Sequence, residues 1–189
     1  MKYIPIIELP ILIIMVLIRS VMLSRHGIKA IVFGVTNKTD YIMLPIIICF
    51  FYGILSAVFD LPCPGVLKSH FWKMKILNIF PIAVCTISLI WFGITLKIFG
   101  TSFRVGIDEK TNDKLITHGT FSVSRNPIYT AFIAFFIGIF LTYPTIITCV
   151  FLVLLAAVIH RQILREEKFL KDHYGEEYEN YCNKVHRYI

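Results

Sequence analysis

Residues 126–159 read NPIYTAFIAFFIGIFLTYPTIITCVFLVLLAAVI, two uncharged apolar runs separated by a short break. The runs are residues 128–141 and 146–159, and the break between them is Thr-Tyr-Pro at residues 142–144. In lipid every backbone polar group needs an internal partner, so such runs cross a bilayer as helices. Because proline interrupts a helix and the break carries no charge, the stretch predicts two membrane spans joined as a tight hairpin. The alternative is one kinked, over-long helix.

The rest of the chain repeats this apolar character. Of its 189 residues, 57% are hydrophobic and 16% are charged, which is far more apolar than a soluble domain. Three further apolar runs, residues 4–23, 41–59 and 76–99, precede the hairpin. Each has about the 18 or more residues that a span needs, and one cleaved signal peptide cannot explain repeated runs. We therefore expect an all-α integral membrane protein with about five transmembrane helices.

Positive charge is distributed unevenly along the chain and predicts its orientation. The longest polar connection, residues 100–125, and the tail after residue 160 both carry lysines and arginines. With five spans these two segments lie on the same side of the membrane, and the positive-inside rule places that side in the cytoplasm. We therefore expect a multi-pass protein with its N-terminus outside and with any site on these segments facing the cytoplasm.

The basic balance of the chain does not indicate a nucleic-acid partner. The net charge is +7, but the basic residues lie between and after apolar runs, where anionic lipid headgroups attract them. The five cysteines form no CxxC pair, and His118, His160 and His173 have no metal-ligand spacing. We therefore expect a lipid bilayer around the chain, and neither nucleic acid nor metal as a partner.

Two polar segments flank the hairpin and hold nearly all the candidate chemistry. Asn126 fits a helix N-cap, and Pro127 fits the first helical position, where its missing N–H costs nothing. In the tail, Glu167 precedes Lys171 by four residues, the favourable order for an ion pair, and Gly175 separates this helix from a shorter one. Because both segments lie on one side of the membrane, we expect a site where they meet.

The same two segments carry a resemblance to a known family. They read LITHGTFSVSRNPIYTAF at residues 115–132 and REEKFLKDHYGEEYENYCNKVHRYI at residues 165–189. In this order, with one apolar hairpin between them, they resemble the isoprenylcysteine carboxyl methyltransferases and their prokaryotic relatives. Those proteins are membrane-embedded and use S-adenosylmethionine. The chain departs from the family pattern at Asn126, where histidine is common, at Phe121, where tyrosine is common, and in an acidic run shortened to Glu166 and Glu167.

The resemblance implies a catalytic region at residues 100–189, where the polar loop and the helical tail form the cofactor site. Residues 1–99 then supply three N-terminal spans. No GxGxxG loop is present, so the site has to be built from the ends of the helices. The residues expected to bind the cofactor are Asp113, Lys114, Leu115, Ile116, His118, Gly119, Phe121, Arg125, Asn126, Pro127, Tyr129, Glu166, Glu167, Tyr178 and Tyr188.

Each part of S-adenosylmethionine requires a different partner. Backbone groups of residues 113–116 and aromatic rings suit the adenine and ribose, and Glu166 or Glu167 can accept hydrogen bonds from hydroxyls or from the ammonium. Asn126 and Tyr129 are expected near the methionine end. The expected catalytic residues are Arg161, Arg165 and Glu167, with one arginine holding the acceptor's carboxylate.

The leading hypothesis is a methyltransferase that acts on the carboxylate of a prenylated cysteine or a similar lipid-like acceptor. The alternatives are an amine or phospholipid N-methyltransferase and a non-catalytic transporter or scaffold. Residues 41–59 and 128–159 carry none of the intramembrane charges that a transporter uses, which disfavours the last alternative. Apart from the resemblance, Asn126 is an ordinary helix start, and Glu166 and Glu167 have the character of a solvated face.

Overall fold

The computed structural model describes residues 4–25, 43–65, 69–71, 79–99 and 115–189. Within these residues the regular structure is helical, and the β-type pairing is a single isolated bridge between His70 and Thr145. The helices are α1 (Ile4–Arg25), α2 (Met43–Phe59), α4 (Ile79–Phe99), the 3-10 helix η3 (Gly119–Ser122), α5 (Pro127–Thr142), α6 (Ile146–Tyr174) and α7 (Glu176–Cys182). Each of the five apolar runs therefore contributes a helix, as the sequence predicts.

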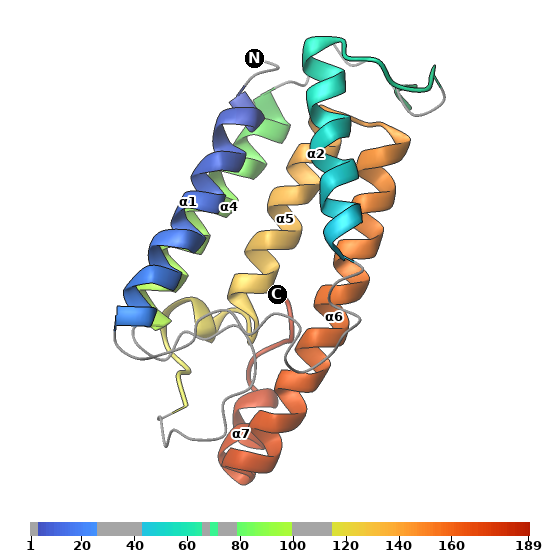
Figure 1. Ribbon diagram of the computed structural model, residues 1–189. Coiled ribbons are helices and arrows are strands. Elements are labelled where there is room, and N and C mark those ends of the chain that lie inside the picture. Colours follow the sequence, from blue (N-terminus) through green and yellow to red (C-terminus); the bar gives the residue numbers. More distant parts are fainter. Residues whose placement is uncertain (1–3, 26–42, 66–68, 72–78, 100–114) are drawn as a thin grey trace.

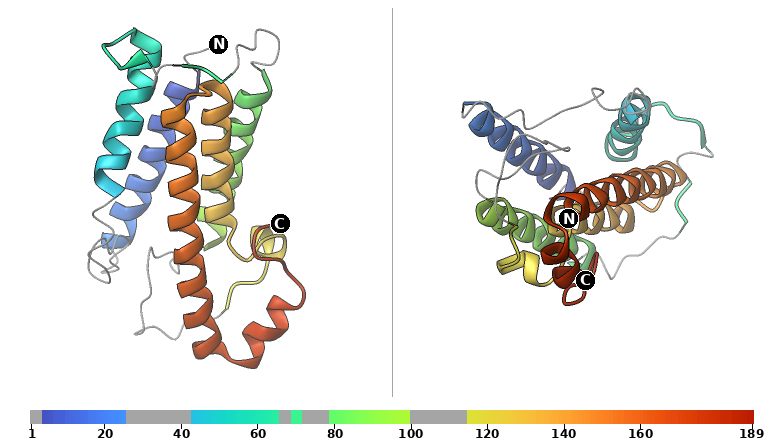
Figure 2. Two further views of the ribbon diagram at one scale, coloured as in Figure 1. Left: turned by 90° about the vertical axis from the view of Figure 1, so that its right-hand side faces the viewer. Right: turned by 90° about the horizontal axis from the view of Figure 1, so that it is seen from below.

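The long helices lie side by side along one common direction (Figures 1 and 2). Two of them, α4 and α6, are long and apolar enough to cross a membrane, while Ile47–Ser56 within α2 and Pro127–Thr142 (α5) are shorter apolar helical segments. α6 runs well past the start of α5, and α7 folds back from its end so that the C-terminus returns beside the beginning of α5 (Figure 1). This return brings the tail against the polar segment that precedes α5.

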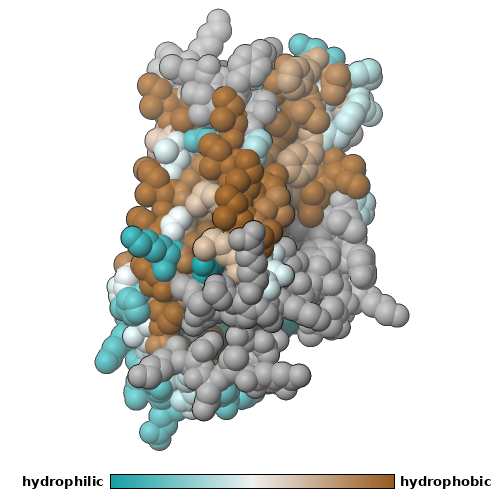
Figure 3. Space-filling view, turned by 60° about the vertical axis from the view of Figure 1, so that its left-hand side comes forward, coloured by the Kyte–Doolittle hydropathy of each residue, from teal (hydrophilic) through white to brown (hydrophobic). Residues whose placement is uncertain are grey.

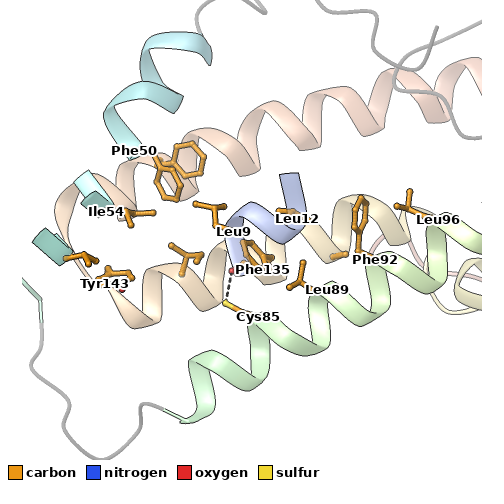
Figure 4. Packing of buried hydrophobic residues seen from close by; sticks show 14 residues of the cluster. Leu9, Leu12, Phe50, Ile54, Cys85, Leu89, Phe92, Leu96, Phe135 and Tyr143 are labelled. Carbon is orange, nitrogen blue, oxygen red and sulfur yellow. Dashed lines mark hydrogen bonds between the residues drawn. The ribbon is translucent and has the colours of Figure 1, made fainter. Parts of the chain in front are cut away.

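Aliphatic and aromatic side chains together fill the interior of the bundle (Figure 4). Phe50 of α2 stacks on Phe151 of α6 with ring centroids 3.8 Å apart, and its edge meets Phe136 of α5 at 5.5 Å. Edge-to-face and offset contacts of this kind stabilise beyond the area that they bury. Phe50 is fully buried, so this cluster fixes α2 against the hairpin.

Gly138 allows α4 and α5 to approach closely. A Cβ atom at this position would lie 2.4 Å from Cys85 Sγ and 3.0 Å from the carbonyl oxygen of Pro81. Small residues at such crossings allow helices to pack backbone to backbone in lipid, where no hydrophobic effect drives them together. The Cys85 thiol also donates a hydrogen bond to the carbonyl oxygen of Phe135, 3.5 Å away. α4 and α5 are therefore closely packed along this crossing.

The outer faces of the bundle are apolar. Figure 3 shows hydrophobic side chains covering much of one face and hydrophilic ones toward its two ends, including the end at which α6 meets α7. Exposed residues on this apolar surface include Ile14, Leu17 and Ile18 of α1 and Ile87 and Ile90 of α4. An exposed apolar patch of this extent is unfavourable in water and suits contact with lipid tails. The membrane character predicted from composition is thus supported, and the number of spans remains a prediction.

A buried carboxylate connects α1 to α4. Glu8 is 7% exposed, and its Oε1 accepts a hydrogen bond of 2.6 Å from the Thr86 hydroxyl. Polar contacts between helices stabilise a bundle in lipid by about 0.6 kcal/mol on average. This bond therefore helps to hold the first helix in register.

The predicted hairpin is confirmed, and it has its own helix cap. α5 ends at Thr142 and α6 begins at Ile146, so the segment is two helices and not one kinked helix. The Thr145 hydroxyl accepts a hydrogen bond from the backbone N–H of Thr148, and the Thr148 hydroxyl accepts one from the N–H of Thr145. This reciprocal arrangement satisfies two backbone donors at the start of α6.

Candidate functional site

The polar segment before α5 and the C-terminal tail meet, as the sequence predicts. The backbone N–H of Arg125 donates to the carbonyl oxygen of His186 at 3.0 Å, and the Asn126 amide donates to that of Arg187 at 3.2 Å. Thr130 Oγ1 donates to the carbonyl oxygen of Tyr188 at 3.3 Å. These bonds join residues about 60 positions apart and fix the tail across the start of α5.

Glu167 lies at the centre of this junction and is 9% exposed. Its Oε1 accepts a hydrogen bond of 3.2 Å from the Asn126 amide and lies 3.5 Å from Arg125 Nη2. Its Oε2 accepts from Arg187, with Nε at 2.9 Å and Nη2 at 2.7 Å. A buried charge is tolerated when it is paired and hydrogen-bonded on all sides. The carboxylate is therefore held by three side chains from two distant segments.

Arg187 shows the electrostatic effect of this pairing. The hydrogen bond that Arg187 donates to Glu167 raises the pKa of the Arg187 guanidinium above its ordinary value, because the carboxylate stabilises the charged form. A paired and fully charged arginine positions the tail beside α6.

The expected i,i+4 pair of Glu167 with Lys171 does not form, and that prediction was wrong. Lys171 pairs instead with Glu179 of α7 at 2.9 Å, because Arg125 and Arg187 already occupy both oxygens of Glu167.

Asn126 has a different role from the one expected for its side chain. It is the N-cap residue of α5, and Pro127 follows in the first turn, as predicted. Its side chain, however, makes no capping hydrogen bond and reaches across to Glu167 instead. Ser124 Oγ accepts the backbone N–H of Asn126 at 3.1 Å. A buried carboxylate is a stronger acceptor than a neutral group, which explains why the amide is drawn away from the helix end.

Glu166 has separate partners on the next face of α6. Its Oε1 accepts a hydrogen bond of 2.6 Å from the Tyr129 hydroxyl and one of 2.8 Å from the Gln162 amide. Both donors are neutral, so no described cation compensates a charge on Glu166, and burial raises the pKa of this carboxyl above its ordinary value. Sequence reasoning missed Gln162, although its position four residues before Glu166 on a helix is a usable signal. The two adjacent carboxylates therefore differ in electrostatic environment.

The short helix α7 packs two tyrosines against the rest of the site. Tyr178 and Tyr181 are buried with Val185, and Leu115 packs against them. The Tyr181 hydroxyl donates a hydrogen bond of 2.6 Å to the carbonyl oxygen of Phe121, and burial raises the pKa of Tyr181 to about 12. Burial and the nearby charge of Glu167 also raise the pKa of Tyr178. Both phenols are therefore neutral near pH 7 and act as hydrogen-bonding and apolar groups.

A hollow with a volume of about 500 Å³ lies between α6 and α7. Glu167 and Arg187 form part of its wall, and the largely buried Tyr178 borders it. The full lining is Leu164, Glu167, Lys168, Lys171, Tyr178, Glu179, Cys182, Asn183 and Arg187. Pockets for small molecules have volumes of about 300–1,000 Å³ and combine apolar surface with a few polar groups. In size and chemistry this hollow is a candidate ligand site.

The remaining predicted residues lie around this junction. Phe121 is buried with its ring stacked on Phe99 at 5.0 Å, so it fills the core instead of offering a free stacking surface. Tyr188 Oη lies 2.6 Å from His160 Nδ1. Gly119 has a φ of +63° and lies against Ile98, which suits glycine at that turn.

Some predicted residues lie apart from the hollow. Ile116 is partly buried and His118 is exposed, and neither lines it. Arg161 is exposed and Arg165 is partly buried, and these two do not line it either. The predictions for Asp113 and Lys114 lie outside the described residues.

Known proteins share sequence with this chain over the same region. The sequence model of a family described as phospholipid methyltransferase matches residues 74–177. A probable protein-S-isoprenylcysteine O-methyltransferase of Oryza sativa subsp. japonica is 36% identical over 91 residues, which are 46% of this chain and 47% of the relative. The protein of the same name in subsp. indica matches equally. The chain thus spans about half the length of these curated relatives.

A longer match joins the chain to a third curated protein. Protein-S-isoprenylcysteine O-methyltransferase B of Arabidopsis thaliana is 26% identical over 167 residues, which are 86% of this chain and 80% of the relative. No solved structure matches the chain.

Proposed function

We propose that this chain, which belongs to the phospholipid methyltransferase family, is a membrane methyltransferase that uses S-adenosylmethionine. Its acceptor in this proposal is the carboxylate of a prenylated cysteine or of a similar lipid-like molecule. The observation that carries the proposal is the junction at Glu167, where Asn126, Arg125 and Arg187 connect two distant polar segments beside a hollow. The names of the rice and Arabidopsis relatives support the choice of acceptor.

The residues of the hollow fit the proposed cofactor. S-adenosylmethionine has a flat adenine, two ribose hydroxyls, a sulfonium and an amino-acid end, and it needs both aromatic and charged partners. The hollow combines amide, ammonium and carboxylate side chains, and the largely buried Tyr178 borders it. Arg125 Nε is buried and has no hydrogen-bond partner among the described residues, so the junction retains an unused donor. Buried donors of this kind usually meet a ligand, an ion or water.

The proposed chemistry requires positioning more than acid or base catalysis. Bound S-adenosylmethionine supplies an electrophilic methyl group on a positively charged sulfur. A carboxylate acceptor is already an anion, so no side chain has to remove a proton. Opposite charges disappear as the bond forms, which makes exclusion of water by the helix ends favourable. The protein then has to align the acceptor's carboxylate with the methyl group and to exclude water from the two reactants.

Acceptor entry follows from the arrangement of the bundle. In our proposal residues 1–99 provide three spans, residues 100–189 form the catalytic region, and the site faces the cytoplasm. A lipid-like acceptor reaches the site sideways from the bilayer, with its polar end beside α6. Arg161 and Arg165 lie on the part of α6 beyond its apolar run, and one of them is proposed to hold the acceptor's carboxylate.

One observation favours a second candidate function, methyl transfer to an amine such as a phospholipid headgroup. Glu166 accepts hydrogen bonds only from neutral donors among the described residues, and burial raises the pKa of its carboxyl above the ordinary value. In its ionised form such a group repels a carboxylate acceptor and attracts an ammonium. An amine acceptor also has to lose a proton, and a carboxylate is the side chain suited to accept it. The matching family, described as phospholipid methyltransferase, agrees with this candidate.

Calorimetry with S-adenosylhomocysteine on the detergent-purified protein tests the proposal first. Binding in the micromolar range is expected, and absence of binding up to millimolar ligand would reject both methyltransferase candidates. Turnover is then compared on farnesylated cysteine, on cysteine without its lipid and on an amine phospholipid. Activity only on the farnesylated acceptor, with little dependence on pH between 6 and 8, supports the carboxylate route. Activity on the amine that rises with pH supports the second candidate.

A further inference from the structure

The charged side chains that line the hollow are unequally paired. Glu167 is bound by Arg187, and Lys171 lies 2.9 Å from Glu179. The fifth charged residue of the lining is Lys168, and it forms no ion pair with any described residue. The lining therefore contains three cations and two anions, and the positive charge that remains is the Lys168 ammonium.

The position of Lys168 makes its charge available to a ligand. It follows Glu167 on α6 and lies one turn from both Leu164 and Lys171, on the side of α6 that lines the hollow. Asn183, the C-cap residue of α7, lines the hollow as well and carries an amide with two donor hydrogens. An exposed ammonium and an amide in one hollow suit a negatively charged ligand group that accepts hydrogen bonds.

S-adenosylmethionine contains only one anionic group. Its adenine and ribose are neutral, and its sulfonium and ammonium are cations that Lys168 would repel. The α-carboxylate is therefore the one part of the molecule that an unpaired lysine attracts. We propose that Lys168, assisted by Asn183, binds the α-carboxylate of the cofactor and so orients its amino-acid end in the hollow. This inference rests on the cofactor assigned under the proposed function.

A pair of ligands separates this role from a general effect on the hollow. S-adenosylhomocysteine carries the carboxylate, and its decarboxylated analogue differs only by lacking it. We expect Lys168→Gln to weaken S-adenosylhomocysteine binding roughly fivefold, the effect of an ion pair of about 1 kcal/mol, in calorimetry on the full-length protein. Binding of the decarboxylated analogue should change less than twofold. Lys184→Gln, on the same tail but outside the lining, is the matched control and should bind both ligands like the parent.

The outcomes distinguish the inference from the function on which it rests. If Lys168→Gln binds S-adenosylhomocysteine as tightly as the parent does, the assignment of Lys168 is overturned and the cofactor assignment stands. If the variant loses affinity for both ligands equally, Lys168 does not act on the carboxylate and the assignment is overturned as well. If the parent binds neither ligand, the cofactor assignment itself fails, and the role of Lys168 fails with it.

Discussion

Replacing Glu167 by glutamine removes the negative charge that two arginines share at the junction of loop and tail. The side chains concerned are poorly accessible, with exposed fractions of 11% for Glu167, 13% for Arg125 and 35% for Arg187. Removing one partner of a fully buried pair costs about 3–5 kcal/mol, because the other charge stays buried without compensation. Arg187 is about one-third exposed and glutamine keeps one acceptor oxygen. We therefore expect a lower cost, about 2 kcal/mol of unfolding free energy.

The neighbouring variant Glu166→Gln is the matched control for this change. It makes the same substitution one residue earlier, but its partners, Tyr129 and Gln162, are neutral and can still donate to an amide oxygen. Its cost should stay below about 1 kcal/mol. Thermal unfolding in detergent should then show a Tm about 4–8 °C lower for Glu167→Gln and little change for Glu166→Gln.

Cofactor binding by the same two variants completes the experiment. Calorimetry is carried out at a temperature where both variants are folded. We expect Glu167→Gln, or its neighbour Glu166→Gln, to bind S-adenosylhomocysteine about 1.5–3 kcal/mol more weakly than the parent, which is the value for a hydrogen bond to a charged group. An unchanged Tm for Glu167→Gln would refute the reasoning about the junction. Parental affinity in both variants would return the two carboxylates to a solvated helix face without a role in binding.

Three further predictions test other parts of the fold. Gly138→Ala should destabilise the bundle by about 1–3 kcal/mol because the added Cβ overlaps α4, whereas Gly65→Ala, with open space around it, should not. Thermal unfolding of the two variants compares their melting temperatures. Tyr181→Phe should cost about 1 kcal/mol by leaving the carbonyl oxygen of Phe121 without its donor, and an unchanged denaturation midpoint would contradict this. Cysteines introduced at Thr142 and Glu176 should react with an impermeant reagent in intact cells only at Thr142, and labelling of both would reject the orientation.

Local features of the sequence predicted the helices well. The apolar runs, the break at residues 142–144 and Pro127 at the start of α5 each constrain the backbone within a few residues. Proline lacks a donor and restricts its predecessor wherever it occurs, so the hairpin can be read without knowledge of its neighbours. Gly175 likewise separates α6 from α7, and its φ of +54° suits glycine.

The partners of the site residues could not be predicted in this way. The sequence placed Glu167 with Lys171, but the tail folds back and brings Arg187 to Glu167, while α7 brings Glu179 to Lys171. The side chain of Asn126 turns from its own helix end to a carboxylate 41 residues away. Each of these choices depends on which acceptor is strongest once the chain has folded, and that competition has no local signal.

The sequence by itself determined that this protein is a membrane helical bundle with two polar segments on one side, because hydrophobicity and backbone restrictions act over neighbouring residues. It also determined which residues carry charge near the site. Only the tertiary structure decided which of those charges neutralise one another. The return of the tail to the start of α5 binds Glu167 from both sides and leaves Lys168 without an ion pair among the described residues. Electrostatic pairing depends on distance in space, and folding brings Arg125 to Glu167 although the chain separates them by 42 residues.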